Sequence, residues 1–302
     1  MSIKHKGLTV WTLLKTTFTE FFSDNAIKLA ASLSYYTIFS IAPLSIIIIS
    51  VCGLFFGEDA VKGEFYGQIN EFVGPNAAAQ IQEIITNTKL SGDSALGLII
   101  GIVVLLVGAS GVFVEIQSSI NYIWGLKAKP DKSIKKFIKN RLMSFSMIGA
   151  IGFLLLVSLL ANTVLDLLRS QLKELLPETT VYLVYVLNFG LLFCIITLLF
   201  SIVFRTLPDG HVTWKDTLVG SGTTAILFML GKFGISIYLT NSNVASAFGA
   251  AGSIIIILLW VYYSAIILYF GAEFTKVYAR LHGKKITPNA YAVKIRKDVI
   301  DE

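Results

Sequence analysis

Charged residues are scarce in this chain of 302 residues, of which only 15% are Asp, Glu, Lys or Arg. Soluble globular chains carry about 25% charged residues. Hydrophobic residues make up 55% of the chain, and its mean hydropathy is +0.73. A soluble protein of this size could not cover so much apolar surface, so the composition predicts a membrane protein.

Cysteine and histidine are too few and too scattered to form a disulfide framework or a metal site. Cys52 and Cys194 both lie inside apolar stretches, where cysteine packs as a small hydrophobic residue. His5, His211 and His282 lie far apart in polar segments, without the spacing of metal ligands. We therefore predict no disulfide bond, no metal site and no cofactor.

The sequence motifs of common enzymes are missing as well. No P-loop, nucleophile elbow or dinucleotide-binding fingerprint occurs. Metal-dependent hydrolysis of a phosphodiester needs several clustered His and Asp ligands, and His211 with Asp209 is the only close pair. The basic stretch 127–141 could attract RNA, but the retention of positive charge in cytoplasmic loops explains it equally well. We predict no catalytic residue, no enzymatic activity and no nucleic-acid partner.

Six apolar stretches are long enough to cross a bilayer as helices, which takes about 20 residues each. They cover residues 30–56, 95–116, 142–165, 181–204, 217–239 and 249–272. A transmembrane strand barrel would instead show alternating segments of about ten residues. The sequence thus predicts an all-α integral membrane protein, with a single membrane domain over residues 1–280 and a basic cytoplasmic tail at 281–302.

Two further segments are expected to be helical outside the spans. Residues 8–24 place Trp11, Leu14, Phe18 and Phe21 at helical spacing. This amphipathic helix either lies in the membrane interface or packs on the cytoplasmic ends of the bundle, and the pattern leaves both open. The acidic segment 57–94 is predicted to form two short helices that cap the outer face.

Lysine and arginine gather on one side of the predicted spans. Twenty of the 25 lie in the N-terminal segment, in the loops after the second and fourth spans, or in the tail, and only four lie on the other side. Because positively charged loops stay in the cytoplasm, both termini are predicted to be cytoplasmic.

Several strings along the chain resemble a known family. They are residues 30–44 (Ala-Ala-Ser-Leu-Ser-Tyr-Tyr-Thr-Ile-Phe-Ser-Ile-Ala-Pro-Leu), 119–125, 205–216, 259–264 and 271–273. Their order and spacing resemble the YihY/virulence factor BrkB family of bacterial inner-membrane proteins, over roughly residues 25–280. The resemblance implies a location in the bacterial inner (plasma) membrane. Members are associated with resistance to host killing, and transport of lipids or solutes has been suggested. A ribonuclease BN name once given to the family is regarded as a misassignment.

Three charged residues fall at similar depth near the cytoplasmic ends of the predicted spans: Glu115, Arg205 and Glu273. Charged groups at membrane depth are costly and usually face the bundle interior or a cavity. The three could form one network. Such a network would act either as a salt-bridge clamp or as a gate or a site for an anionic headgroup or coupling ion.

Other polar residues lie deeper in the spans. Lys232 of the fifth span either extends its amine toward the interface or faces a cavity near Asp166 and Asn162 of the third. Tyr35 in the first span and Asn188 in the fourth complete the candidate pathway residues.

Two functions fit these observations. The first is a transporter or flippase-like protein that moves a lipid or an amphipathic anion, with membrane lipids as partners. The alternative is a non-transporting scaffold that supports envelope integrity. Gly97 and Gly101 form a GxxxG pair, which leaves a homodimer open.

Overall fold

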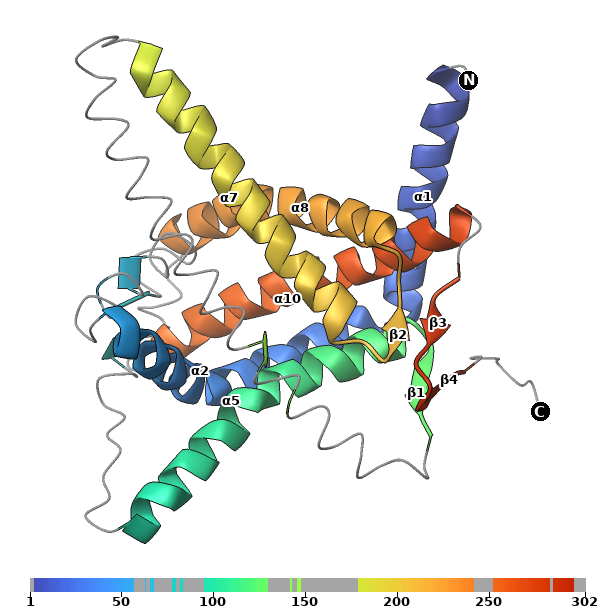
Figure 1. Ribbon diagram of the computed structural model, residues 1–302. Helices are drawn as coiled ribbons and strands as arrows, with labels where there is room; N and C mark the ends of the chain where they lie inside the picture. Colours follow the sequence, from blue (N-terminus) through green and yellow to red (C-terminus); the bar gives the residue numbers. More distant parts are fainter. Residues whose placement is uncertain are drawn as a thin grey trace.

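The computed structural model of this protein describes a set of long helices and four short strands (Figure 1). The described residues are 3–56, 63, 66–67, 78–79, 82–83, 95–129, 142, 146–147, 179–241, 252–282 and 285–295. Most of the third predicted span and of the predicted outer cap lie outside these residues.

Five of the long helices coincide with predicted apolar stretches, and the sixth, α1, contains the predicted amphipathic segment 8–24. The described long helices are α1 (Ile3–Ser23), α2 (Ala26–Phe56), α5 (Ala95–Ile123), α7 (Thr179–Thr206), α8 (Trp214–Asn241) and α10 (Gly252–Leu281). Among the described residues, four segments are long and apolar enough to cross a membrane: Ala26–Ile47, Phe189–Thr206, Trp214–Ile235 and Ile254–Leu281. A helix satisfies its own backbone hydrogen bonds, which a bilayer cannot do, so helices are the expected form for such segments.

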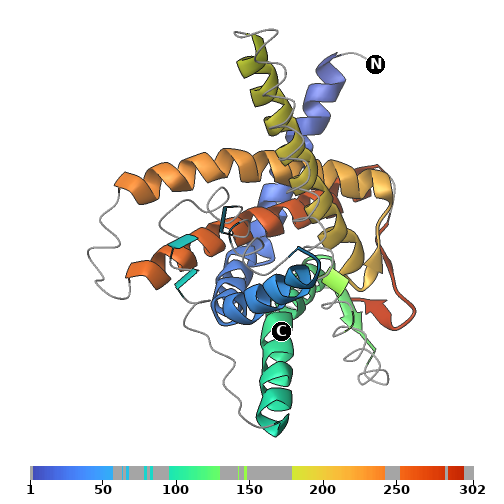
Figure 2. The same ribbon diagram turned by 60° about the vertical axis from the view of Figure 1, so that its left-hand side comes forward.

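The helix α10 lies at the centre of the described bundle. It packs against α2, α8, α1 and α5, while α2 also packs on α5 and α7 on α8. Figures 1 and 2 show α5 and α7 crossing the other helices, each with its N-terminal half extending away from them. Large apolar side chains cover the outside of these helices, among them Phe39, Val186, Leu230 and Phe233. Such an apolar exterior is the opposite of a soluble surface and suits contact with lipid.

The strands gather at one end of the bundle, which we call the strand end. Strand β1 (Leu126–Ala128) pairs antiparallel with β4 (Ala292–Lys294), and β2 (Gly210–His211) pairs antiparallel with β3 (Thr287–Pro288). The C-terminal ends of α5, α7 and α10 and the start of α8 all reach this end.

The described part of the C-terminal tail differs from the sequence prediction. Residues 281–302 were expected to form a solvated basic tail, but residues 287–288 and 292–294 form β3 and β4. Ile286 and Ala292 are buried there against the bundle. These two apolar side chains gain from leaving water, which explains why this part of the tail packs despite its lysines.

The helices α8 and α10 approach each other closely through reciprocal pairs of glycine and threonine. A Cβ atom on Gly220 would lie 1.8 Å from the Thr275 hydroxyl, and one on Gly271 would lie 1.9 Å from the Thr224 hydroxyl. Both threonine hydroxyls donate to backbone carbonyls of their own helix, Thr224 to Gly220 and Thr275 to Gly271. Membrane helices associate through close contact of this kind, because lipid provides no hydrophobic force between them.

The N-terminal helix α1 has two apolar stripes with different environments. Leu13 and Phe21 are buried, and Leu13 packs with Phe274 and Val277 of α10. A second stripe, made of Trp11, Leu14, Phe18 and Phe22, is exposed. Figure 1 shows α1 crossing α10 steeply near the strand end. Phe21, expected on the same face as Trp11, therefore belongs to the buried stripe instead.

Candidate functional site

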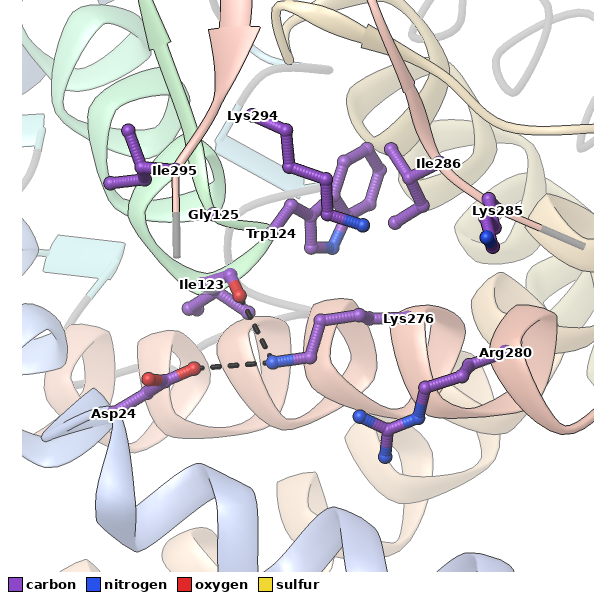
Figure 3. Close-up of a pocket in the computed structure, with 10 residues that line it drawn as sticks. All are labelled: Asp24, Ile123, Trp124, Gly125, Lys276, Arg280, Lys285, Ile286, Lys294 and Ile295. Atoms are coloured by element: carbon purple, nitrogen blue, oxygen red, sulfur yellow. Dashed lines mark hydrogen bonds and ion pairs between the residues drawn. The ribbon is translucent and has the colours of Figure 1, made fainter. Parts of the chain in front are cut away.

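Glu273 and Lys276 form the centre of a buried ion network at the strand end. Glu273 is fully buried on α10, and its Oε1 lies 2.6 Å from the Nζ of Lys276 one turn later. The same Nζ lies 3.2 Å from Glu20 Oε2 and 3.2 Å from Asp24 Oδ2. It also donates to the carbonyl oxygen of Ile123 at 3.0 Å (Figure 3). One ammonium therefore joins α1, α5 and α10.

Arg280 adds a second cation one turn further along α10. Its guanidinium donates to Glu20, the residue that also contacts Lys276. Partial burial of Glu20 opposes its charged form, but the hydrogen bond from Arg280 and the charge of Lys276 outweigh this effect and hold the pKa of Glu20 below its ordinary value. Glu20 is therefore ionised at neutral pH and attaches α1 to the end of α10.

The predicted network of Glu115, Arg205 and Glu273 is not found, because each residue has other partners. The guanidinium of Arg205 donates to the carbonyl of Val212 and lies 4.5 Å from the ring centre of Trp214. It thereby fixes the connection between α7 and α8. Glu273 contacts Lys276 instead. The structure thus separates three residues that the sequence placed in one possible network, because a hydropathy pattern does not give the direction in which each side chain extends.

Glu115 belongs to a separate polar group inside the bundle. It is half-buried on α5 and accepts a hydrogen bond of 3.4 Å from the buried hydroxyl of Ser119. Tyr269 of α10 is fully buried, and its hydroxyl lies near both Ser119 and Glu115 but has no hydrogen-bond partner among the described residues. A carboxylate and two hydroxyls from facing helices therefore meet at this point.

Further buried hydroxyls lie on α7 and α8. In the described part of the chain, Thr197 Oγ1, Ser201 Oγ and Ser221 Oγ are buried without a hydrogen-bond partner. Ser221 follows Gly220, which faces Thr275 of α10, so it lies within about two helical turns of Tyr269 in depth. Buried hydroxyls without partners call for an explanation such as water or a ligand.

The remaining predicted candidates are dispersed. Tyr35 is 62% exposed on α2, and its ring contacts the rings of Tyr36, edge-on, and Phe39, at a tilt, rather than facing the interior. Lys232 is half-buried on α8. Asp166 and Asn162, its expected partners, lie outside the described residues. Asn188 lies on α7, but its side chain is also outside the described set.

A second buried carboxylate, Asp209, was not among the predicted sites. Its two oxygens accept hydrogen bonds from the side-chain amides of Gln117 at 3.0 Å and Asn121 at 2.9 Å, both on α5. The backbone N–H of Asp209 donates to Asn121 Oδ1 at 2.7 Å, and its carbonyl accepts from the N–H of Asn289. The residue joins α5, the α7–α8 connection and β3. Asn121 and Asp209 both lie in strings that carry the family resemblance. Their presence in those strings was the feature of the sequence that could have pointed to this contact.

The start of α8 is stabilised by hydrogen bonds between Thr213 and Asp216. Thr213 Oγ1 donates to Asp216 Oδ2 at 2.6 Å and accepts from the N–H of Asp216. This arrangement resembles the capping box that begins many helices. It holds Trp214, and with it Arg205, in place beside the strand end.

Comparison with known proteins shows which family the chain resembles over most of its length. The model of the family described as Virulence factor BrkB matches residues 17–295. A UPF0761 membrane protein of Saccharophagus degradans is 28% identical over 87% of this chain and 58% of its own length. One of Alteromonas mediterranea is 26% identical over 83% of this chain and 82% of its own length. The chain thus spans less than two thirds of the first relative. Among solved structures, none matches the chain.

Proposed function

We propose that this chain, which belongs to the virulence factor BrkB family of membrane proteins, moves a lipid or another amphipathic anion across the bacterial inner membrane. The observation that carries the proposal is the set of polar side chains inside an otherwise apolar bundle. Glu115, Ser119 and Tyr269 lie near one another between α5 and α10, and the unpartnered hydroxyl of Ser221 on α8 lies at related depth. Polar groups are expensive in a membrane interior and commonly mark substrate or ion pathways.

The orientation proposed for the protein places the strand end in the cytoplasm. Described lysines and arginines concentrate there, among them Lys127, Lys215, Arg280 and Lys294. Positive loops are retained on the cytoplasmic side. With six spans, both termini would lie on that side.

The orientation can be tested with two fusions at the C-terminus. A fluorescent protein that matures only in the cytoplasm should fluoresce, and alkaline phosphatase, which matures only outside, should be inactive. Active phosphatase with a dark fluorescent fusion would contradict the orientation.

The alternative function, a scaffold that supports envelope integrity without transport, is favoured by a different observation. The interface between α8 and α10 is filled without space for a passing molecule. A Cβ on Gly231 would lie 1.9 Å from the hydroxyl of Tyr263, in addition to the close pairs at Gly220 and Gly271. A pathway between these two helices would need them to separate.

Flux through purified variants in proteoliposomes distinguishes the two functions. Glu115→Gln removes a charge, and Tyr269→Phe removes one hydroxyl from the proposed pathway. Tyr238→Phe removes the same hydroxyl from a tyrosine that is 54% exposed on α8 and serves as the matched control. We expect lipid scrambling or anion flux to fall about tenfold or more in the first two variants and to stay near wild type in the control. Equal flux in all of them, with wild-type melting temperatures, would exclude the pathway.

A further inference from the structure

A cavity of about 420 Å³ opens at the strand end between the last turns of α10, the end of α5 and the C-terminal segment (Figure 3). Its volume lies within the range of small-molecule sites, about 300–1,000 Å³. We name it the basic cavity because four cationic residues line it, Lys276, Arg280, Lys285 and Lys294, against a single carboxylate, Asp24.

The cations of the basic cavity differ in how they are neutralised. Lys276 and Arg280 contact Glu20, Asp24 and Glu273, as described above. Lys285 and Lys294 form no ion pair with a described residue, although both line the cavity. Figure 3 shows the Lys294 side chain extending beside Trp124 toward Ile286. Counted over the described residues, positive charge is therefore in excess around the cavity.

The wall of the basic cavity is both apolar and rigid. Trp124 is almost fully buried, and its indole N–H donates to the carbonyl of Ala272 at 3.0 Å. Ile286 is buried next to it. Gly125 has a φ of +65°, which glycine adopts without strain, and its carbonyl accepts from the N–H of Ile295. Cations above a fixed apolar wall suit an anion that also carries an apolar part.

The position of the basic cavity indicates which anion it meets. Asp24 follows α1 directly, and the exposed stripe of α1 carries Trp11, Phe18 and Phe22. Aromatic side chains of this kind gather at the boundary between lipid and water. The cavity borders the end of α1, so an α1 that lies in the membrane interface would bring it to the depth of phosphate headgroups, where clusters of Lys and Arg bind anionic headgroups.

We propose that the basic cavity binds a phosphate-bearing anion, with Lys285 and Lys294 as the cations that take its charge. The phosphate can belong to a phospholipid headgroup or be free in solution, since both present the same oxygens to the amines. The site does not depend on transport and would serve a scaffold equally well. A failure of the flux assay would therefore leave this proposal intact.

Equilibrium dialysis of the purified full-length protein in detergent tests the proposal, with radiolabelled inorganic phosphate as one probe and short-chain phosphatidylglycerol as the other. The test variant is Lys285→Gln with Lys294→Gln. The matched control is Lys127→Gln with Lys215→Gln, which removes two exposed lysines at the strand end that do not line the cavity. A third variant, Lys285→Arg with Lys294→Arg, keeps the charge.

We expect saturable binding of at least one probe by the wild type. The Kd should rise about tenfold or more in the test variant and stay within about twofold in the control and arginine variants. Tighter binding of phosphatidylglycerol would identify a lipid headgroup as the ligand, and tighter binding of inorganic phosphate would identify free phosphate. Absence of saturable binding, or an equal loss in the test and control variants, would overturn the proposal.

Discussion

Lys276 joins residues that lie more than 250 positions apart in the chain. Its ammonium contacts Glu20, Asp24 and Glu273, and its side chain is only 18% exposed. Removing one partner from a buried ion pair leaves an uncompensated charge away from water, which destabilises a protein strongly. The network should therefore show strong coupling between its members.

Lys276→Gln should lower the free energy of unfolding by about 3–5 kcal/mol, because Glu273 would remain buried without its cation. Adding Glu273→Gln should recover part of this loss, since it removes the orphaned charge. Unfolding of both single variants and the double variant in detergent gives the coupling free energy. Lys127→Gln, at an exposed lysine, is the control and should stay within about 0.5 kcal/mol of wild type. Additive effects of the two substitutions would show that the ion pair contributes nothing.

The structure gives the charged residues singled out from the sequence other partners than those predicted. Glu273 was identified because a carboxylate at membrane depth is unusual, and its neighbour Lys276 lies at i+3 on the same face. The contacts with Glu20 and Asp24 depend on how α1 crosses α10. Patterns within a short stretch of sequence do not predict how two helices so far apart in the chain pack together. The same applies to Asp209, whose amide partners lie 88 and 92 residues earlier.

At the scale of the elements, hydropathy predicted the helices but placed some ends too early. The second and sixth spans were predicted to end at 116 and 272, whereas α5 continues to Ile123 and α10 to Leu281. Hydropathy falls where charged residues begin, yet both helices continue because their last turns pack on α1 and the strands. The tail strands were missed for a related reason, since β1 and β4 form only when the two distant segments meet.

The close contact between α8 and α10 predicts that substitution by alanine has different effects on protein stability at two glycines. Gly271→Ala places a methyl group against the Thr224 side chain and should destabilise the protein by about 1–3 kcal/mol. Gly234→Ala, also inside a helix, meets no atom within 4 Å and should be neutral or stabilising by up to about 1 kcal/mol. Thermal unfolding in detergent compares the two. A similar melting temperature for both would mean that the helices are not in close contact at Gly271.

The exposed stripe of α1 predicts that this helix lies in the membrane interface while it packs on α10. A nitroxide label at Phe18→Cys should be relaxed mainly by oxygen, which concentrates in lipid. A label at Ser23→Cys, on the polar side of α1, should be relaxed mainly by a water-soluble nickel complex. Cys52 and Cys194 are first replaced by Ala. Equal access of the nickel complex to both labels would mean that α1 is surrounded by water.

At the scale of the whole molecule, the described part of the protein is closely connected at the strand end. Ion pairs, amide contacts and both small sheets join α1, α5, α7, α8 and α10 at the strand end. The N-terminal halves of α5 and α7 diverge at the other end (Figure 2).

The most direct test of the central claim is transport by the wild-type protein alone. Purified protein is reconstituted into liposomes, and scrambling of fluorescent phospholipids and flux of small anions are measured beside empty liposomes. The account predicts movement of at least one anionic lipid or amphipathic anion well above the empty vesicles. Movement no faster than in empty liposomes for every lipid class and anion would contradict transport and favour the scaffold.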